Sequence, residues 1–139
     1  NASFSRTFGA PGPVAFVSQS GAMGEAILSH ADHLNVGVTM FVSMGNRADV
    51  SANDLLEFWR DHEDIKCILL YLESFGNPRR FVPLAREVSR DKAIITVKAG
   101  RSSAGALAAS SHTGSLAGAD VAAWTFSTRC GTCRPSTSP

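Results

Sequence analysis

Residues 65–73 read Ile-Lys-Cys-Ile-Leu-Leu-Tyr-Leu-Glu, and this stretch decides the fold class. A strand is predicted from Ile65 to Glu73, and its residues Cys67 to Leu72 are apolar or aromatic throughout, which is typical of a strand covered on both faces. Strands of this kind occur in parallel sheets that carry helices on each side. Glu73 follows the run directly, at the end of a strand where open parallel sheets bind their ligands.

The segments on either side continue an alternation of strands and helices. Further strands are predicted at residues 14–17, 36–44 and 93–97, and helices at 21–34, 51–62 and 77–90. A small-residue stretch, 102–118, and an Ala-rich helix to about Phe126 follow the last strand. This order predicts a doubly wound, flavodoxin-like parallel sheet in three layers, α/β/α. No apolar run remains after Phe126 to supply a fifth strand.

The predicted helices carry recognisable ends and faces. The first has small and apolar residues at helical spacing, namely Ala22, Met23, Ala26, Ile27 and Ala31. Either Ser51 or Asn53 caps the second helix, whose buried stripe is predicted to be Leu55, Leu56, Phe58 and Trp59. Asn77 and Pro78 open the third helix, and Pro83 is expected to distort it.

A chain of 139 residues is expected to form one domain. Residues 1–12 are rich in polar residues, Gly and Pro and are interpreted as a linker, residues 13–126 as the domain, and residues 127–139 as a disordered or non-native tail. The first residue is Asn rather than Met, which suggests a segment of something longer.

The formal net charge of +1 provides no electrostatic attraction for nucleic acids or acidic membranes, so bound anions must be held locally. No apolar run approaches twenty residues, and residues 1–6 lack a signal-peptide pattern. The chain is therefore expected to be soluble and cytoplasmic.

Metal and disulfide chemistry find little support. Cys67 lies in an apolar run, and Cys130 and Cys133 form a CxxC that lacks further zinc ligands and the strand and helix of a redox site. His30, His33 and His62 have no neighbouring cysteine or carboxylate set, and the acidic run at Asp61, Glu63 and Asp64 is interpreted as a solvated helix end. No metal site is predicted.

Polar motifs follow the strands in turn. Ser18-Gln-Ser-Gly21 follows the first, Glu73 the third, and Lys98-Ala-Gly-Arg101 the fourth. The strongest signal is Ser110-Ser-His-Thr-Gly-Ser-Leu-Ala-Gly-Ala-Asp120, in which His112 has almost no bulky neighbours. A histidine in such a segment can be approached closely by other surfaces.

These motifs, from Gly12 to Asp120, resemble the CoA-ligase domain of the succinyl-CoA synthetase α-chain and of the ADP-forming acyl-CoA synthetases. The likeness rests on 18–21, on Tyr71-Leu-Glu-Ser74, and on 98–102 together with 111–120. It implies that His112 is phosphorylated in a cycle that converts acyl-CoA, phosphate and nucleoside diphosphate to acid, CoA and nucleoside triphosphate. It further implies that Glu73 holds the second ring nitrogen of His112.

The chemistry of the residues agrees with these roles. A neutral imidazole can attack an acyl phosphate, and a helix that begins at Ser20-Gly21 offers N–H donors to the phosphoryl oxygens. Ser18, Thr113 and Gly114 are the other phosphate-binding candidates, and Lys98 and Arg101 are candidates for phosphate or CoA contacts. The alternatives are that Ser20 only caps its helix, that Glu73 is a solvated carboxylate, and that the two cations are ordinary surface charges.

The resemblance implies partners that the chain does not contain. In the family CoA binds mainly to a Rossmann-like domain, and the nucleotide site belongs to an ATP-grasp domain. No Gly-rich dinucleotide fingerprint is present here, so the isolated chain is expected to be catalytically incomplete. CoA and the magnesium nucleotide would be substrates of the complete enzyme, with no cofactor bound in this domain.

Two other classes of function remain open. One is a non-catalytic, synthetase-like regulatory module, for example one fused to a GNAT-type acetyltransferase. The other, a flavin-binding or response-regulator domain, lacks the hydroxyl-rich phosphate loop and the acidic pair that such domains place after their first strand.

Overall fold

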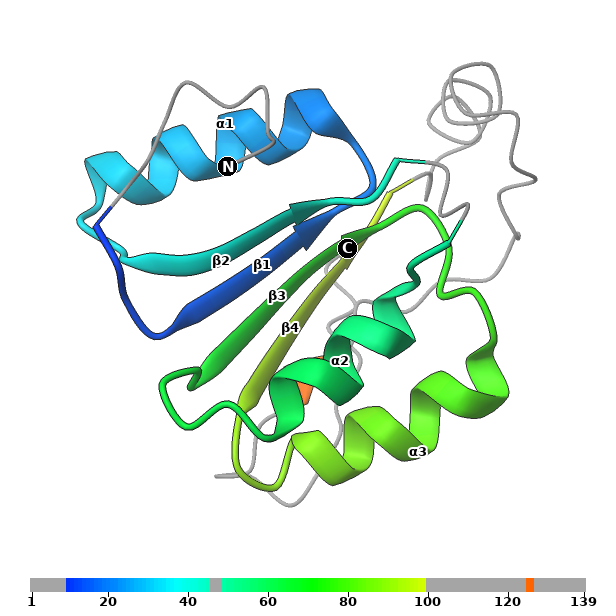
Figure 1. Cartoon of the computed structure of the whole chain (residues 1–139). Helices are drawn as coiled ribbons and strands as arrows, with labels where there is room; N and C mark the ends of the chain where they lie inside the picture. The colour runs from blue at the N-terminus through cyan, green and yellow to red at the C-terminus, as the bar shows by residue number, and fades with distance from the viewer. Residues whose placement is uncertain (1–9, 46–48, 100–124, 127–139) are drawn as a thin grey trace, which may run out of the picture.

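The computed structural model describes residues 10–45, 49–99 and 125–126 (Figure 1). Strands and helices alternate along the chain as β1 (Val14–Ser18), α1 (Gly21–His33), β2 (Val38–Ser43), α2 (Ala52–Arg60), β3 (Cys67–Leu72), α3 (Pro78–Val88), β4 (Ala93–Lys98) and β5 (Thr125–Phe126). The strands form one sheet in the order β2-β1-β3-β4-β5. Strands β1 to β4 are parallel, and this order is that of flavodoxin-like folds, so the predicted fold class is confirmed.

Helices cover both faces of the sheet, which gives three layers (Figure 1). Helix α1 lies on one face over β1 and β2, and helices α2 and α3 lie side by side on the other face. Such layering buries the apolar faces of the strands between helices.

The main core lies between the sheet and the α2–α3 layer. Alternate residues of the central strands point into it, because successive side chains of a strand face opposite sides. Its members are Ala15, Val17, Ala52, Leu55, Leu56, Trp59, Ile65, Ile68, Leu70, Leu72, Phe81, Leu84, Ala85, Val88 and Ile94.

The prediction that strand Cys67–Leu72 is covered on both faces holds for one face only. Ile68, Leu70 and Leu72 are buried, whereas Leu69 and Tyr71 on the α1 side are half-buried. On β4 the residues of that side, Ile95 and Val97, are exposed. Within the described residues α1 makes its main contacts with β1 and β2, at the other side of the sheet from β4, which agrees with this difference.

The N-termini of the helices follow the predicted cap residues. The hydroxyl of Ser20 caps α1, and the Asn77 side chain accepts a hydrogen bond from the N–H of Arg79 at the start of α3. Of the two candidates for α2, Ser51 is the cap, and the carboxylate of Asp54 reaches back to it. Helix α3 continues through Pro83, which lies near the beginning of the helix. Proline has no N–H to donate to the carbonyl four residues earlier, but Pro83 is exposed, so water can bind that carbonyl instead.

Three details differ from the sequence predictions. Phe58 is 57% exposed, with its ring against His62, because Leu55, Leu56 and Trp59 already fill the buried face of α2. The buried residues of α1 are Gly24 and Leu28, neither of which was among the predicted positions. Of those positions, Ile27 and Ala31 are half-buried, and Ala22, Met23 and Ala26 are exposed.

The third difference concerns the end of the expected Ala-rich helix. Thr125–Phe126 forms a short strand that pairs antiparallel with β4, where a helix to Phe126 was predicted. Thr and Phe are both good strand formers, and the edge of β4 offers them backbone partners. The sheet therefore has a fifth strand that the apolar pattern did not indicate.

Candidate functional site

The loops that leave the parallel strands are joined at the carboxyl edge of the sheet. The N–H of Gln19 donates to the carbonyl of Tyr71 at 3.0 Å, and the N–H of Met44 donates to the carbonyl of Ser18 at 2.9 Å. On the other side, the N–H of Ala99 donates to the carbonyl of Leu72 at 2.8 Å. Because the chain leaves the adjacent strands β1 and β3 in opposite directions, this edge contains the switch point at which such folds bind ligands.

The turn between β1 and α1 is tied together by its own hydroxyl groups. Ser18 is fully buried, and its Oγ donates to the Ser20 carbonyl at 2.6 Å and accepts from the Ser20 N–H at 3.2 Å. The Oγ of Ser20 accepts a hydrogen bond from the N–H of Met23 at 3.4 Å, which confirms the capping role. The hydroxyl of Ser18 is thus committed to shaping the turn.

The exposed N-terminus of α1 retains hydrogen-bond donors. The amide of Met23 is bonded to the Ser20 side chain, and that of Gly24 to the Ser20 carbonyl. The amides of Gly21 and Ala22, both exposed residues, belong to the first turn, where the helix itself provides no acceptor. This terminus has the donors and the dipole orientation that suit an anion.

Gln19 is the residue of this site that the sequence analysis missed. It is only 4% exposed, and its Oε1 accepts hydrogen bonds from the backbone N–H groups of Glu73 and of Ser74, the latter at 3.1 Å. The available signal was a polar residue placed directly after a buried strand. The side chain joins the turn after β1 to the loop after β3.

Glu73 is half-buried at this joint. Burial, and secondarily the negative charge of Glu73, raise the pKa of the Tyr71 hydroxyl above its ordinary value. Both predicted interpretations of Glu73, as the partner of His112 and as a solvated carboxylate, stay predictions.

Lys98 is the last residue of β4, opposite Leu72 in the register, and is 5% exposed. It is therefore not an ordinary surface charge, which was one of its two predicted interpretations. Burying an ammonium group is costly unless it is paired, so its position at the carboxyl edge of the sheet is consistent with a role in the site.

The structure thus brings five of the predicted site residues to one edge of the sheet: Ser18, Ser20, Gly21, Glu73 and Lys98. The remaining four, Arg101, His112, Thr113 and Gly114, lie outside the described residues.

Histidines elsewhere do not build a metal centre. Among the residues that the structure describes, no three His, Cys, Asp or Glu side chains are grouped as metal ligands. The Nδ1 of His33 lies 2.6 Å from the Ser29 carbonyl oxygen of its own helix, and the ring of His62 packs against Phe58. Cys67 is half-buried, and burial raises the pKa of its thiol. None of the described helices is long and apolar enough to cross a membrane.

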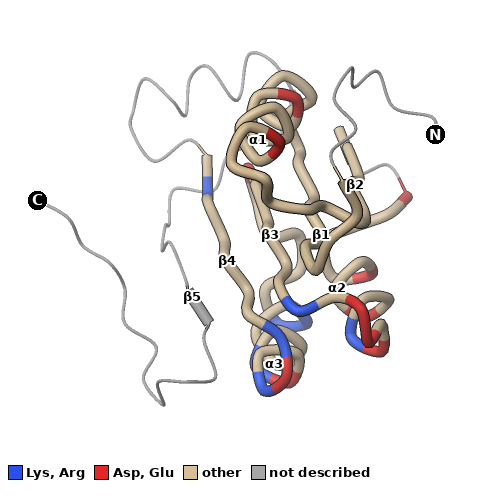
Figure 2. Tube along the Cα trace, turned by 90° about the vertical axis from the view of Figure 1, so that its left-hand side faces the viewer, with Lys and Arg blue, Asp and Glu red and all other residues tan. Residues whose placement is uncertain are grey.

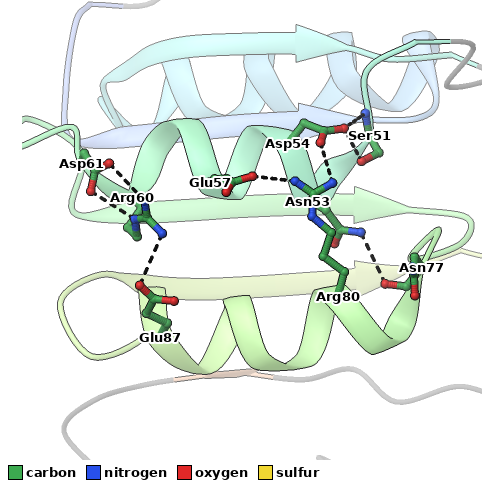
Figure 3. A network of polar contacts seen from close by, with 9 residues as sticks. All are labelled: Ser51, Asn53, Asp54, Glu57, Arg60, Asp61, Asn77, Arg80 and Glu87. Carbon is green, nitrogen blue, oxygen red and sulfur yellow. Dashed lines mark hydrogen bonds and ion pairs between the residues drawn. The ribbon is translucent and has the colours of Figure 1, made fainter.

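Most charged residues of the described part lie on α2 and α3 and in the loops beside these helices (Figure 2). Figure 3 shows that Arg80 joins Asp54 and Glu57 across the two helices, with N···O distances of 2.8 and 2.5 Å. At the other end Arg60 reaches Asp61 and Glu87. Such exposed pairs link the two helices and each contributes little to stability.

Comparison with known proteins settles the family. A family model described as "Succinyl-CoA ligase like flavodoxin domain" matches residues 11–138. The chain belongs to this family. The succinyl-CoA-ligase-like flavodoxin domain resembles the α-subunit of acetate–CoA ligase (ADP-forming) I of Pyrococcus furiosus, with 51% identity over 86% of the chain and 26% of the relative. It is also 48% identical to acetate–CoA ligase (ADP-forming) of Methanocaldococcus jannaschii, over 87% of the chain and 17% of that protein.

A solved structure agrees with both fold and family. The dinucleotide-forming acetyl-coenzyme A synthetase 1 of Ca. Korarchaeum cryptofilum, determined in complex with phosphate and ADP, matches with a TM-score of 0.72 and 45% identity. The match covers 78% of the domain and 24% of the synthetase chain. The succinyl-CoA-ligase-like domain thus spans about a quarter or less of these relatives.

Proposed function

We propose that the chain is the ligase domain of a nucleoside-diphosphate-forming acyl-CoA synthetase and that His112 carries the phosphoryl group. The observation behind the proposal is that the turn at Ser18–Gly21 is hydrogen-bonded to the loop at Glu73 at the carboxyl edge of the sheet. An anion-binding helix terminus and a partly buried carboxylate are the two supports that a phosphohistidine needs, and both stand at the switch point. The family to which the chain belongs and its ADP-forming relatives support the same reaction.

The transfer proceeds in two displacements. A ring nitrogen of His112 attacks the phosphorus of an acyl phosphate, the N–P bond forms, and the carboxylate of the acid leaves with the electrons of the broken P–O bond. A terminal oxygen of the nucleoside diphosphate then attacks the same phosphorus, and the N–P bond breaks to return neutral imidazole and release the triphosphate. The acyl phosphate itself arises when inorganic phosphate displaces CoA from acyl-CoA.

Glu73 assists by accepting a hydrogen bond from the other ring nitrogen of His112. This contact fixes the tautomer and stabilises the positive charge that the ring acquires when it is phosphorylated. A carboxylate held at its backbone, as Glu73 is, presents a defined partner to an incoming ring.

The phosphoryl oxygens are received by the N-terminus of α1. The amides of Gly21 and Ala22 and the hydroxyl of Ser20 supply donors, and Ser18 maintains the turn that aims them. Thr113 and Gly114, next to the histidine, supply further hydrogen bonds to the phosphoryl oxygens. Lys98 and Arg101 balance the negative charge of phosphate or CoA.

The complete reaction requires partners. A CoA-binding Rossmann-like domain and an ATP-grasp domain or subunit supply the CoA and nucleotide sites, with magnesium entering on the nucleotide. The small share of its relatives that the chain spans is consistent with an incomplete catalyst.

Phosphorylation of the chain tests the proposal. The protein is mixed with its ATP-grasp partner and γ-labelled ATP, and the wild type is compared with His112→Asn and with His30→Asn, whose histidine is exposed on α1. We expect a base-stable, acid-labile label in the wild type and in His30→Asn and none in His112→Asn. Absence of label in all three, with a partner active on another synthetase domain, would favour the regulatory module instead.

A further inference from the structure

Gln19 lies just beyond the end of β1, where the chain after β3 has no further β1 backbone to pair with. Strand β1 ends at Ser18 and the chain turns into α1, whereas the loop after β3 continues past Leu72. The N–H groups of Glu73 and Ser74 therefore extend beyond the β1–β3 ladder. The Oε1 of Gln19 takes the place of the absent carbonyls by accepting from both.

Both the backbone and the side chain of Gln19 serve this joint. Its N–H donates to the Tyr71 carbonyl, and its Oε1 accepts from the N–H groups of the two residues after Leu72. Gln19 is therefore hydrogen-bonded both to β3 and to the loop that follows it. A carboxamide that is 4% exposed would be costly to bury without such partners. Hydrogen bonds to one oxygen from two consecutive amides restrain the backbone of Glu73 more than either would alone.

We propose that Gln19 is a positioning residue that sets the place of the Glu73 carboxylate relative to the phosphate-binding N-terminus of α1. This inference rests on the function proposed above. Gln19 immediately precedes Ser20, the cap of that helix, so one residue ties the anion-binding turn to the carboxylate. Transfer through a histidine between these two groups depends on their spacing, and displacements of about 1 Å are enough to slow such reactions strongly.

A matched pair of substitutions separates the hydrogen bonds from the volume of the side chain. Gln19→Met keeps the length but removes the strong acceptor, and Gln19→Glu keeps an acceptor oxygen while adding a charge. Amide hydrogen exchange of the 139-residue chain then measures directly whether the Glu73 and Ser74 amides are hydrogen-bonded to Gln19. We expect protection of the Glu73 and Ser74 amides to fall about 10-fold or more in Gln19→Met and to persist in Gln19→Glu.

The phosphorylation assay reports the consequence. With the ATP-grasp partner and γ-labelled ATP, Gln19→Met should lower the maximal rate of His112 labelling about 10- to 100-fold with the KM for ATP unchanged, because the nucleotide site lies in the partner. Gln19→Glu should retain more of the rate, because it keeps an acceptor oxygen for the Glu73 and Ser74 amides.

Different results would overturn different claims. Wild-type amide protection in Gln19→Met means that Gln19 does not accept these two hydrogen bonds. Lost protection with an unchanged labelling rate means that the hydrogen bonds have no positioning role. A labelling rate that is unaffected by Glu73→Gln, in a chain that labels on His112, refutes the role of Glu73 and leaves the phosphohistidine intact. Absence of label on wild-type His112 refutes the proposed function, whatever the exchange data show for Gln19.

Discussion

The ring of Phe41 lies directly over the backbone of Gly24, so that a Cβ at Gly24 would be 2.8 Å from Phe41 Cζ. Such a Cβ would also be 3.3 Å from the Cβ of Ser18. Helix α1 can approach the sheet this closely only because position 24 has no side chain. The turn at the start of α1, which is proposed to bind phosphate, depends on that approach.

Gly24→Ala is therefore expected to destabilise the fold. Alanine improves helix propensity by about 1 kcal/mol, but overpacking costs about 1–3 kcal/mol because Phe41 is itself stacked on the buried Phe16. Urea unfolding measures the balance. Gly21→Ala is the control, since the nearest atom to its added Cβ would be 4.0 Å away, and a loss of stability as large in the control would contradict the packing explanation.

Lys92 should contribute to stability through its buried ammonium group. It is 6% exposed, and its Nζ donates to the carbonyls of His62 at 2.5 Å and of Ile65 at 2.9 Å. Lys92→Met removes both donors and should lower the free energy of unfolding by about 1–3 kcal/mol. Lys66→Met, at an exposed side chain, should change it by less than about 0.5 kcal/mol; equal effects would show that the buried contacts contribute nothing.

Asp54 should make stability depend on pH in the acid range. Hydrogen bonds from the hydroxyl and the N–H of Ser51, and then the neighbouring Arg80, hold the pKa of its carboxyl below the ordinary 3.8. The folded pKa is thus lower than the unfolded one, so the contribution is complete above about pH 3.8 and is lost as the pH falls through the folded pKa. Because the carboxylate is 42% exposed, the contribution should stay below about 1 kcal/mol.

Thermal unfolding of wild type and Asp54→Asn between pH 2.5 and 7 tests this dependence. The two proteins should differ near neutrality and converge at the acid end, whereas Asp64→Asn, at an exposed site, should follow the wild type throughout. A difference that is constant with pH would exclude the ionised form of Asp54 as its source.

Ser20 allows capping and phosphate binding to be separated. Ser20→Ala should cost about 0.5–1 kcal/mol of stability and Ser20→Gly only a few tenths, since glycine is tolerated at this position of a helix. If the hydroxyl also contacts phosphate, both variants should slow His112 labelling about 10-fold. Labelling at the wild-type rate in Ser20→Gly would leave Ser20 with the capping role alone.

Much of the site could be predicted from local patterns. Glu73 was identified because it directly follows an apolar strand, and Ser20 because it lies in the turn after another such strand; parallel strands bring their carboxyl ends to the same edge. Gln19 was missed because its importance lies in a contact with residues 54 and 55 positions away, which no local pattern indicates. The burial of Lys98 was missed for a related reason, since whether the end of a strand is covered depends on the elements packed against it.

The sequence by itself determined the class of fold, the alternation of strands and helices from β1 to β4, and the caps Ser20 and Asn77, because hydrophobic periodicity and capping act over a few residues. The tertiary structure alone decided which faces are covered, as the half-buried Leu69 and the exposed Phe58 show. It also decided that Thr125–Phe126 pairs with β4 and that Gln19 holds Glu73. These features depend on contacts between segments far apart in the chain, and such contacts stabilise the protein only after the fold has brought those segments together.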